Sequence, residues 1–185
     1  MTMSADGFFC GPNGELDWMS QVHDKELNDD DVAFFRTFDQ GFIGYPTAIG
    51  MIPYWQNVAQ SPEASEEGKA IANAVLKLNP YIVSKKEETL PWKGNLLVAK
   101  TDEELVVKVN QIKKQPGKDL GIPGGIRTAQ TFVRLGLVDE CMLRMQPVAI
   151  GKGKRVFEER KNLKLVSVKR YNSGIVRLHY RMKSK

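Results

Sequence analysis

The sequence predicts an α/β fold in which helices cover both faces of a mixed sheet. Short apolar runs typical of buried strands alternate with segments of helical periodicity along most of the 185 residues, which is the pattern of βαβ units. The last two apolar runs, 163–171 and 175–181, are separated only by Asn172-Ser-Gly174, so an antiparallel hairpin is expected there. A chain of this length supports one well-buried core, and we expect a single domain over residues 1–185.

Composition narrows the possible partners and the compartment. The formal net charge is +5 and the pI is about 9.1, which suits an anionic ligand. The basic residues are scattered, without the basic stripe interleaved with aromatics that indicates nucleic acid. No run is long and apolar enough for a membrane span, and no signal-peptide pattern is present. Cys10 and Cys141 form no CxxC pair, so we expect a cytoplasmic protein without a metal site or a disulfide.

The first strand and helix are marked by turn residues and by acids. Residues 1–9 are expected to form a strand that leads into a loop rich in glycine, proline and asparagine. A helix is expected over 32–38, with aromatic side chains on its buried face. Asp29–Asp31 would then stand at its start, where carboxylates cap a helix and stabilise its dipole.

The middle of the chain repeats the alternation of strand and helix. Gly41–Tyr45 is expected to be a short buried strand, and Pro46-Thr47 opens the next helix. A further helix is expected over 68–78 and ends at Asn79-Pro80. Strands follow over 81–84 and 95–99, and Thr101-Asp-Glu-Glu104 is a capping box for a helix over 105–114, whose apolar face holds Leu105, Val109 and Ile112.

The stretch from Asp119 to Glu140 carries the strongest functional signal. It has the pattern of a short strand, a glycine pair and an amphipathic helix whose apolar face is formed by Ile126, Ala129, Phe132 and Val133, with a left-handed cap expected at Gly136. Gly124 and Gly125 have no Cβ, so the backbone can take positive φ and a ligand can approach the amides. The helix N-terminus, with Arg127 and Thr128 in its first turn, then favours a phosphate. The alternative is an ordinary tight connection between strand and helix.

The last part of the chain is expected to be mainly strand. Residues 141–150 read as a long strand interrupted at Pro147, which indicates a bulge or a sheet edge. The apolar segments 142–150 and 163–168 exceed what one small sheet easily covers, which favours a homodimer.

A set of short motifs resembles one family in order and in spacing along nearly the whole chain. The motifs are Met3-Ser-Ala-Asp-Gly-Phe8, Gly44-x-x-Thr47, Tyr81-Ile-Val-Ser84, Gln115-Pro-Gly-Lys-Asp119, Gly124-Gly125, Gly136-Leu-Val-Asp-Glu140, Pro147-x-x-x-Gly151-x-Gly-Lys-x-x-Phe157 and Ser173-Gly-x-Val176. They are similar to those of the dihydrofolate-reductase-like family, and most of all to the C-terminal reductase domain of bifunctional riboflavin-biosynthesis proteins and its stand-alone bacterial relatives.

The resemblance implies a three-layer α-β-α fold with a central mixed sheet, a homodimer, and NADPH lying across the carboxyl ends of the strands. Such a location is also expected from the general placement of ligands in α/β sheets. The starts of two helices would face the pyrophosphate, and residues at the end of another strand would recognise the adenosine 2′-phosphate. The residues implied are Gly44, Tyr45 and Thr47 at the first helix start, Gly124, Gly125, Ile126, Arg127 and Thr128 at the second, and Ser84 and Lys85 at the strand end.

Three departures from the family pattern bear on function. Tyr45 stands where relatives usually have Arg or Lys, which removes a charge from the cofactor site and leaves NADH possible beside NADPH. Relatives carry several more residues before the first motif, which indicates a shortened first strand or a misassigned start. The chain has no H-x-E or P-C-x-x-C zinc signature, so any role in riboflavin synthesis concerns only the reduction step.

Asp31 is the candidate catalytic acid. Asp31-Val-Ala-Phe-Phe-Arg36 resembles the helix that carries the acid of dihydrofolate reductases, and a carboxyl buried beside a ring could relay a proton; the alternative is a helix cap. Asp6 and Asp17 could contact substrate or fix turns, and Trp18, Tyr54 and Trp55 could line a ring-binding cleft or pack in the core.

Two functions from different classes follow. The first is an NAD(P)H-dependent reductase resembling 5-amino-6-(5-phosphoribosylamino)uracil reductase and dihydrofolate reductase, which delivers a hydride to a small heterocyclic or ribosyl substrate. The alternative is a non-catalytic nucleotide-binding or dimeric scaffold protein that has lost the activity. The absence of a charge at Tyr45 and the shortened N-terminus expected from the resemblance favour the alternative.

Overall fold

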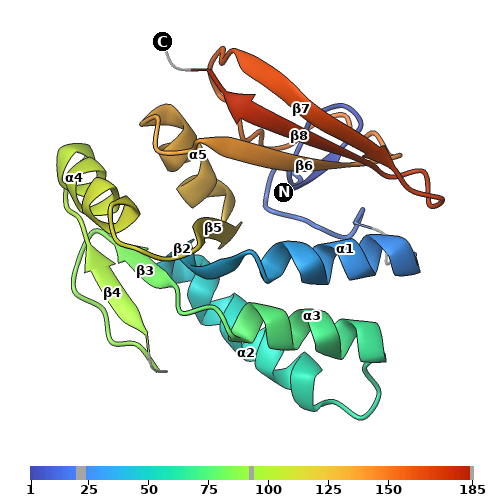
Figure 1. Ribbon diagram of the computed structural model, residues 1–185, viewed down its shortest axis with the longest axis horizontal. Coiled ribbons are helices and arrows are strands. Elements are labelled where there is room, and N and C mark those ends of the chain that lie inside the picture. Colours follow the sequence, from blue (N-terminus) through green and yellow to red (C-terminus); the bar gives the residue numbers. More distant parts are fainter. Residues whose placement is uncertain (20–23, 92–93, 184–185) are drawn as a thin grey trace. The chain divides into compact units, whose positions relative to one another are not determined.

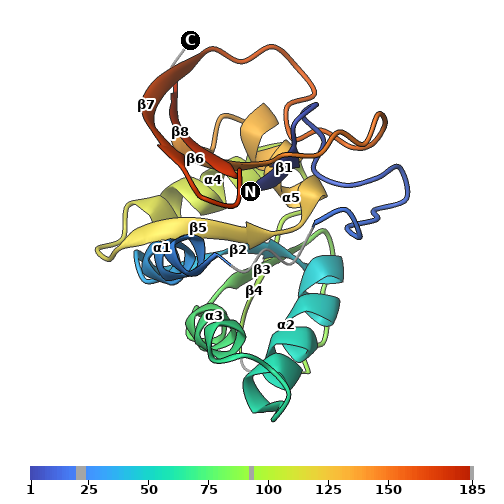
Figure 2. The ribbon, with the colours of Figure 1, turned by 90° about the vertical axis from the view of Figure 1, so that its right-hand side faces the viewer.

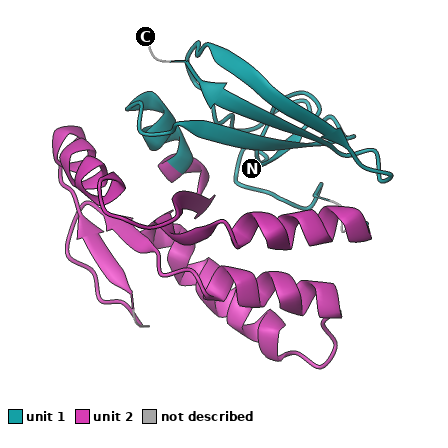
Figure 3. Cartoon of the chain, in the orientation of Figure 1, with its two compact units in different colours: residues 1–24, 129–185 teal, residues 25–128 magenta. Residues whose placement is uncertain are grey.

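A computed structural model of the chain describes residues 1–19, 24–91 and 94–183. The chain divides into two compact units, which Figure 3 shows in different colours. Unit 1 comprises Met1–Asp24 and Ala129–Lys185, and unit 2 comprises Lys25–Thr128. Each unit holds a four-stranded sheet of its own. The single domain over residues 1–185 stays a prediction.

Unit 2 is built on a parallel sheet (Figure 1). Its strands have the order β4-β3-β2-β5, and each neighbouring pair is parallel. The carboxyl ends of parallel strands meet at one edge of a sheet. The strands are β2 (Phe38–Gly44), β3 (Tyr81–Ser84), β4 (Asn95–Val98) and β5 (Asp119–Gly124).

The helices of unit 2 are stabilised by caps and by apolar packing. They are α1 (Lys25–Phe35), α2 (Tyr45–Gln60), α3 (Glu66–Leu76), α4 (Asp102–Lys113) and the first turn of α5 (Ile126–Arg134). Helix α3 contacts both α1 and α2, as Figure 2 shows for α2. The predicted cap of α4 is confirmed, since Thr101 Oγ1 accepts a hydrogen bond of 3.2 Å from Glu104 N. Leu105, Val109 and Ile112 are buried as predicted.

Helix α1 corrects one sequence-based prediction. It begins at Lys25 rather than at residue 32, so Asp29–Asp31 lie in its interior and their interpretation as caps is wrong. Two interactions extend the helix towards its N-terminus. The Leu27 side chain is buried, and Lys25 Nζ pairs with Asp29 Oδ2 at 2.6 Å across one helical turn. Phe38, expected in the helix, begins strand β2 instead.

Unit 1 is built on a mixed sheet with the order β1-β6-β8-β7. Strand β1 is parallel to β6, whereas β8 is antiparallel to both β6 and β7. The predicted C-terminal hairpin is therefore confirmed, with Gly174 at φ 83° in its turn. The strands are β1 (Thr2–Ser4), β6 (Glu140–Gln146), β7 (Leu163–Arg170) and β8 (Val176–Met182).

Two details of unit 1 refine the predicted elements. Strand β6 ends at Gln146 and does not continue to residue 150, because Pro147 has no N–H for the sheet ladder. In the part of α5 that belongs to this unit, Ala129, Phe132 and Val133 are buried, and Gly136 has the predicted left-handed conformation at φ 70°. The α/β class with parallel and antiparallel strands is confirmed.

Candidate functional site

Three strands of unit 2 end side by side at one edge of the parallel sheet. Gly44 of β2 is paired in register with Val83 of β3, and Ile43 of β2 with Gly124 of β5. Helix α2 begins directly after Gly44, and α5 begins two residues after Gly124. The structure therefore brings together, within one unit, most of the residues that the sequence predicted for a cofactor.

The glycines at these strand ends are required for two different reasons. Gly44 has ordinary extended backbone at φ −68°, but a Cβ added there would lie 2.5 Å from Thr128 Oγ1. Gly125 has φ +91°, which side chains rarely adopt, and its Cβ would lie 2.9 Å from Thr47 Oγ1 and 3.4 Å from Thr128 Oγ1. The prediction of positive φ holds for Gly125 and not for Gly124.

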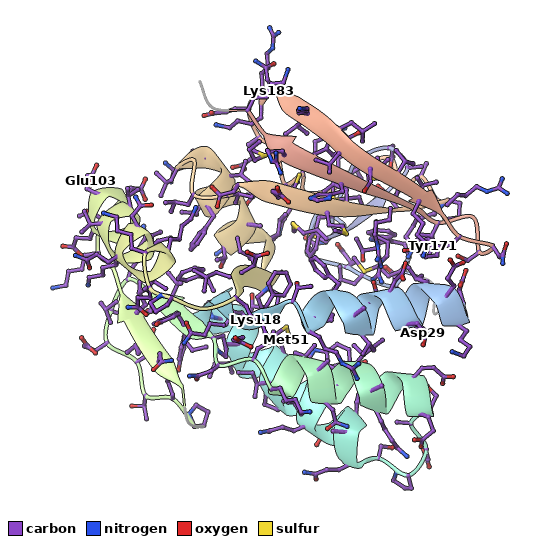
Figure 4. All side chains as sticks on the ribbon, viewed as in Figure 1. Asp29, Met51, Glu103, Lys118, Tyr171 and Lys183 are labelled. Atoms are coloured by element: carbon purple, nitrogen blue, oxygen red, sulfur yellow. The ribbon has the colours of Figure 1, made fainter. Side chains whose placement is uncertain are left out.

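The two threonine hydroxyls thus stand close to the backbone of both turns. Thr47 lies in the first turn of α2, and Thr128 lies in the first turn of α5. Gly124 is covered by α2 as well, because its Cβ would lie 3.1 Å from the sulfur of Met51, which is labelled in Figure 4. The two helix starts are therefore near neighbours, with glycine backbone and hydroxyl groups between them.

The charges at these helix starts differ from those at the other helices. In the described part of the chain, α1, α3 and α4 carry one to three acidic residues in the first turn, whereas α2 and α5 carry none. Gly44 supplies no side-chain hydrogen bond as the N-cap of α2. Acids in the first turn stabilise a helix by offsetting its partial positive charge. At α2 and α5 that charge is not offset, and Arg127 adds to it in the first turn of α5.

The turn after β3 holds the two residues predicted for a 2′-phosphate. Ser84 Oγ accepts a hydrogen bond of 3.2 Å from Lys86 N and donates one of 3.3 Å to Glu88 Oε1. Lys85 is exposed. The Tyr45 hydroxyl donates to Thr89 O at 3.5 Å, which links the start of α2 to this turn. Glu88 was not predicted from the sequence, because its contact with Ser84 depends on how the turn closes.

Asp31 lies elsewhere in unit 2. It is half-buried in the interior of α1, which is not one of the elements that form the glycine turns. Its predicted role as a catalytic acid stays a prediction.

Asp6 fixes a turn in unit 1. Its Oδ1 accepts hydrogen bonds from Ser4 Oγ at 2.6 Å and Ile150 N at 3.2 Å, and its Oδ2 accepts one from Gly151 N at 2.7 Å. These donors, first of all the Ser4 hydroxyl, lower the pKa of the Asp6 carboxyl. The turn-fixing interpretation accounts for this residue, whereas Asp17 is exposed.

The aromatic residues predicted for a ring-binding cleft are distributed over both units. Tyr54 and Trp55 on α2 contact each other edge to face, with ring centroids 5.0 Å apart, and Tyr54 is 56% exposed. Trp18 belongs to unit 1. Among residues 1–19, 24–91 and 94–183, no group of three or more His, Cys, Asp or Glu side chains could hold a metal ion. Within the same ranges, no helix has the length and hydropathy of a membrane span.

Comparison with known proteins gives related sequences and folds. Over 183 residues the chain is 30% identical to the uncharacterized protein YyaP of Bacillus subtilis (strain 168), covering 97% of this chain and 91% of that protein. A putative riboflavin biosynthesis protein from Shewanella sp. PV-4 has a similar structure, with a TM-score of 0.71 at 19% identity, covering 100% and 97% of the two chains. Dihydrofolate reductase from Enterococcus faecalis, solved with NADP(H), gives a TM-score of 0.57 at 12% identity over 99% and 94%.

The likeness to both structures confirms the predicted dihydrofolate-reductase-like fold. The family assignment comes from the sequence itself, since residues 1–177 match the RibD C-terminal domain. The chain therefore belongs to the RibD C-terminal domain family.

Proposed function

We propose that the chain is a reductase that binds a reduced nicotinamide dinucleotide and transfers a hydride to a small heterocyclic or ribosyl substrate. The observation that carries the proposal is the pair of adjacent helix starts at Gly44–Thr47 and Gly124–Thr128. Both lack acidic residues, and glycine backbone separates them. A pyrophosphate needs such a place, because unpaired backbone N–H groups and partial positive charge stabilise its oxygens.

The residues present fit this group. The first N–H groups of a helix have no partner within that helix, so the backbone amides of Tyr45, Thr47, Ile126, Arg127 and Thr128 would serve as donors at the helix starts, whereas Pro46 has none. The hydroxyls of Thr47 and Thr128 would add two side-chain donors. When bound, the dinucleotide supplies the hydride. We propose NADPH, with NADH possible, as the cofactor.

Asp31 is proposed as the proton donor or relay. Hydride transfer to a C=N or C=O group leaves a basic atom that must be protonated, and a half-buried carboxyl on α1 is a suitable donor. Its location inside the helix removes the N-cap explanation for its presence. Family membership and the likeness to a dihydrofolate reductase support this role without assigning the substrate.

A homodimer is proposed as the assembly. Strand β7 lies at an edge of the mixed sheet and exposes three large apolar side chains, Leu165 at 50%, Val166 at 46% and Val168 at 55%. Exposed apolar residues gathered on one strand indicate a surface that associates. A second copy of the chain is the partner that we propose for it.

Calorimetry with NADPH and NADH tests the cofactor proposal directly. Wild type is expected to bind at least one of them, and Gly125→Ala should weaken binding by about tenfold or more, because its Cβ would displace the threonine hydroxyls and strain the turn. Gly136→Ala is a matched control, since Gly136 also has positive φ but no atom within 4 Å of an added Cβ. Equal affinity in a folded Gly125→Ala variant would remove the pyrophosphate from this turn. Tight binding without turnover of any heterocyclic or ribosyl substrate would favour the non-catalytic alternative.

A further inference from the structure

The turn after β3 presents a carboxylate where the 2′-phosphate of NADPH was expected. The Glu88 side chain is only 15% exposed, and its Oε1 accepts a hydrogen bond of 3.3 Å from the Ser84 hydroxyl. Ser84 Oγ also accepts a hydrogen bond of 3.2 Å from the backbone amide of Lys86, so the turn itself orients the hydroxyl. The carboxylate is thus held in place beside the end of the strand.

The positive charges near this carboxylate offset it only in part. Lys86 Nζ lies 3.9 Å from Glu88 Oε1, but its side chain is 80% exposed and its interaction is weakened by solvent. Lys85 is exposed as well. Tyr45, which reaches the same turn through Thr89 O at 3.5 Å, brings no charge. A phosphate bound here would face a fixed negative group and two solvated lysines.

We propose that Glu88 determines cofactor specificity by weakening the binding of the 2′-phosphate, and so brings NADH into the range of cofactors that the chain accepts. Two effects act in the same direction. A phosphate is repelled by the carboxylate, and it must also compete with Glu88 for the only proton of the Ser84 hydroxyl. The ribose 2′-hydroxyl of NADH can instead donate to the carboxylate, which is how acidic residues recognise that group in other dinucleotide sites.

This inference rests on the proposed dinucleotide site, and its test separates the two. The dissociation constants of NADPH and NADH are measured by calorimetry for the full chain with Glu88→Gln and, as a matched control, Glu87→Gln. Both variants remove one negative charge from the same turn, but Glu87 is exposed. Binding of 2′-phosphoadenosine and adenosine fragments gives a second readout that does not depend on the nicotinamide or on activity.

Glu88→Gln is expected to tighten NADPH about fivefold or more while NADH is unchanged or weaker, and Glu87→Gln should change the ratio of the two constants by less than about twofold. Lys85→Ala should act in the opposite direction and weaken NADPH more than NADH. If dinucleotides bind but Glu88→Gln shifts the ratio no more than Glu87→Gln does, Glu88 has no role in specificity and the dinucleotide site stands. If wild type binds neither dinucleotide, both proposals are overturned. Thermal unfolding of each variant checks that it is folded.

Discussion

The two sheets have the same number of strands but offer different surfaces. The parallel sheet of unit 2 offers the ends of its strands, where glycine backbone and helix starts meet. The mixed sheet of unit 1 offers a face and an edge, with apolar and polar side chains alternating along β8 and exposed apolar side chains on β7. A ligand site at strand ends depends on backbone geometry, whereas a contact face depends on which side chains share it.

The stability of the parallel sheet should be the more sensitive to a Cβ added at one of its glycines. A Cβ at Gly41 of β2 would lie 2.3 Å from Gly121 O of β5, and backbone on a neighbouring strand cannot move away as the end of a side chain can. Gly41→Ala is therefore expected to lower the free energy of unfolding by about 3 kcal/mol or more.

Gly50→Ala provides the control for this effect. Gly50 lies inside α2 with nothing within 4 Å of an added Cβ, so alanine there should stabilise by about 0.5–1 kcal/mol. Urea unfolding of both variants measures the difference. Equal stability of Gly41→Ala and wild type would mean that β2 and β5 approach less closely than the structure shows.

If Asp31 is the catalytic acid, its replacement should lower turnover without changing cofactor binding. Asp31→Asn keeps the size of the side chain but removes its proton donor, so turnover should fall about a hundredfold or more while cofactor affinity is retained. The structure has removed the N-cap account of this residue. Steady-state kinetics with any accepted substrate, together with calorimetry, checks the prediction, and full activity in Asp31→Asn would exclude the catalytic role.

The mixed sheet predicts association through β7. The register shifts between Leu165 and Ser167, so Val166 is the extra residue of a bulge. Leu165 opposite Tyr180 and Val168 opposite Leu178 therefore share one face, and Ser167 points to the other. Val168→Lys should weaken a homodimer about tenfold or more, because each copy loses an apolar contact and gains a charge that must be desolvated. Ser167→Lys adds the same charge on the opposite face and should have little effect.

Light scattering across a concentration series distinguishes these variants. The wild type is expected to be dimeric at micromolar concentration, Ser167→Lys should behave like it, and Val168→Lys should shift towards monomer. A wild type that stays monomeric at every concentration would contradict the homodimer, and equal dimerisation of all three proteins would locate the interface away from this face.

Local signals allowed much of unit 2 to be predicted from the sequence. The strand Tyr81–Ser84, the cap at Thr101 and the glycine turn before α5 are each set by residues that are close together in the chain. The absence of acids in the first turns of α2 and α5 is likewise a local property of the sequence.

The features that could not be predicted depend on contacts between distant residues or on the path of a turn. The start of α1 depends on the burial of Leu27, the bulge at Val166 depends on pairing with β8, and the carboxylate of Glu88 is placed by the turn that returns it to Ser84. The bulge and the position of Glu88 have no signal in the residues immediately around them, whereas the spacing of Lys25 and Asp29 is a local signal for α1.

The ion pairs of Glu140 on the mixed sheet should make the smallest contribution to stability of those considered, and that contribution should depend on pH. Glu140 on β6 accepts hydrogen bonds from Arg181 at 2.8 Å and 3.0 Å, and its Oε2 lies 2.7 Å from His179 Nε2. Its pairing with Arg181 first, and with His179 second, lowers the pKa of the Glu140 carboxyl below the ordinary value of 4.5. The stabilisation is therefore fully present above that value and is lost as the pH falls through the lowered pKa.

Because the Glu140 side chain is 41% exposed, solvent screens the pair and its contribution should be only about 0.5 kcal/mol. Glu140→Gln should thus be slightly less stable than wild type at about pH 7, and the difference should be smaller at about pH 3, because the Glu140 carboxyl gains its proton as the pH falls through the lowered pKa. Urea unfolding of wild type and Glu140→Gln at both pH values tests this prediction. A difference in stability that stayed constant or grew as the pH fell would mean that Glu140 acts through packing rather than through its charge.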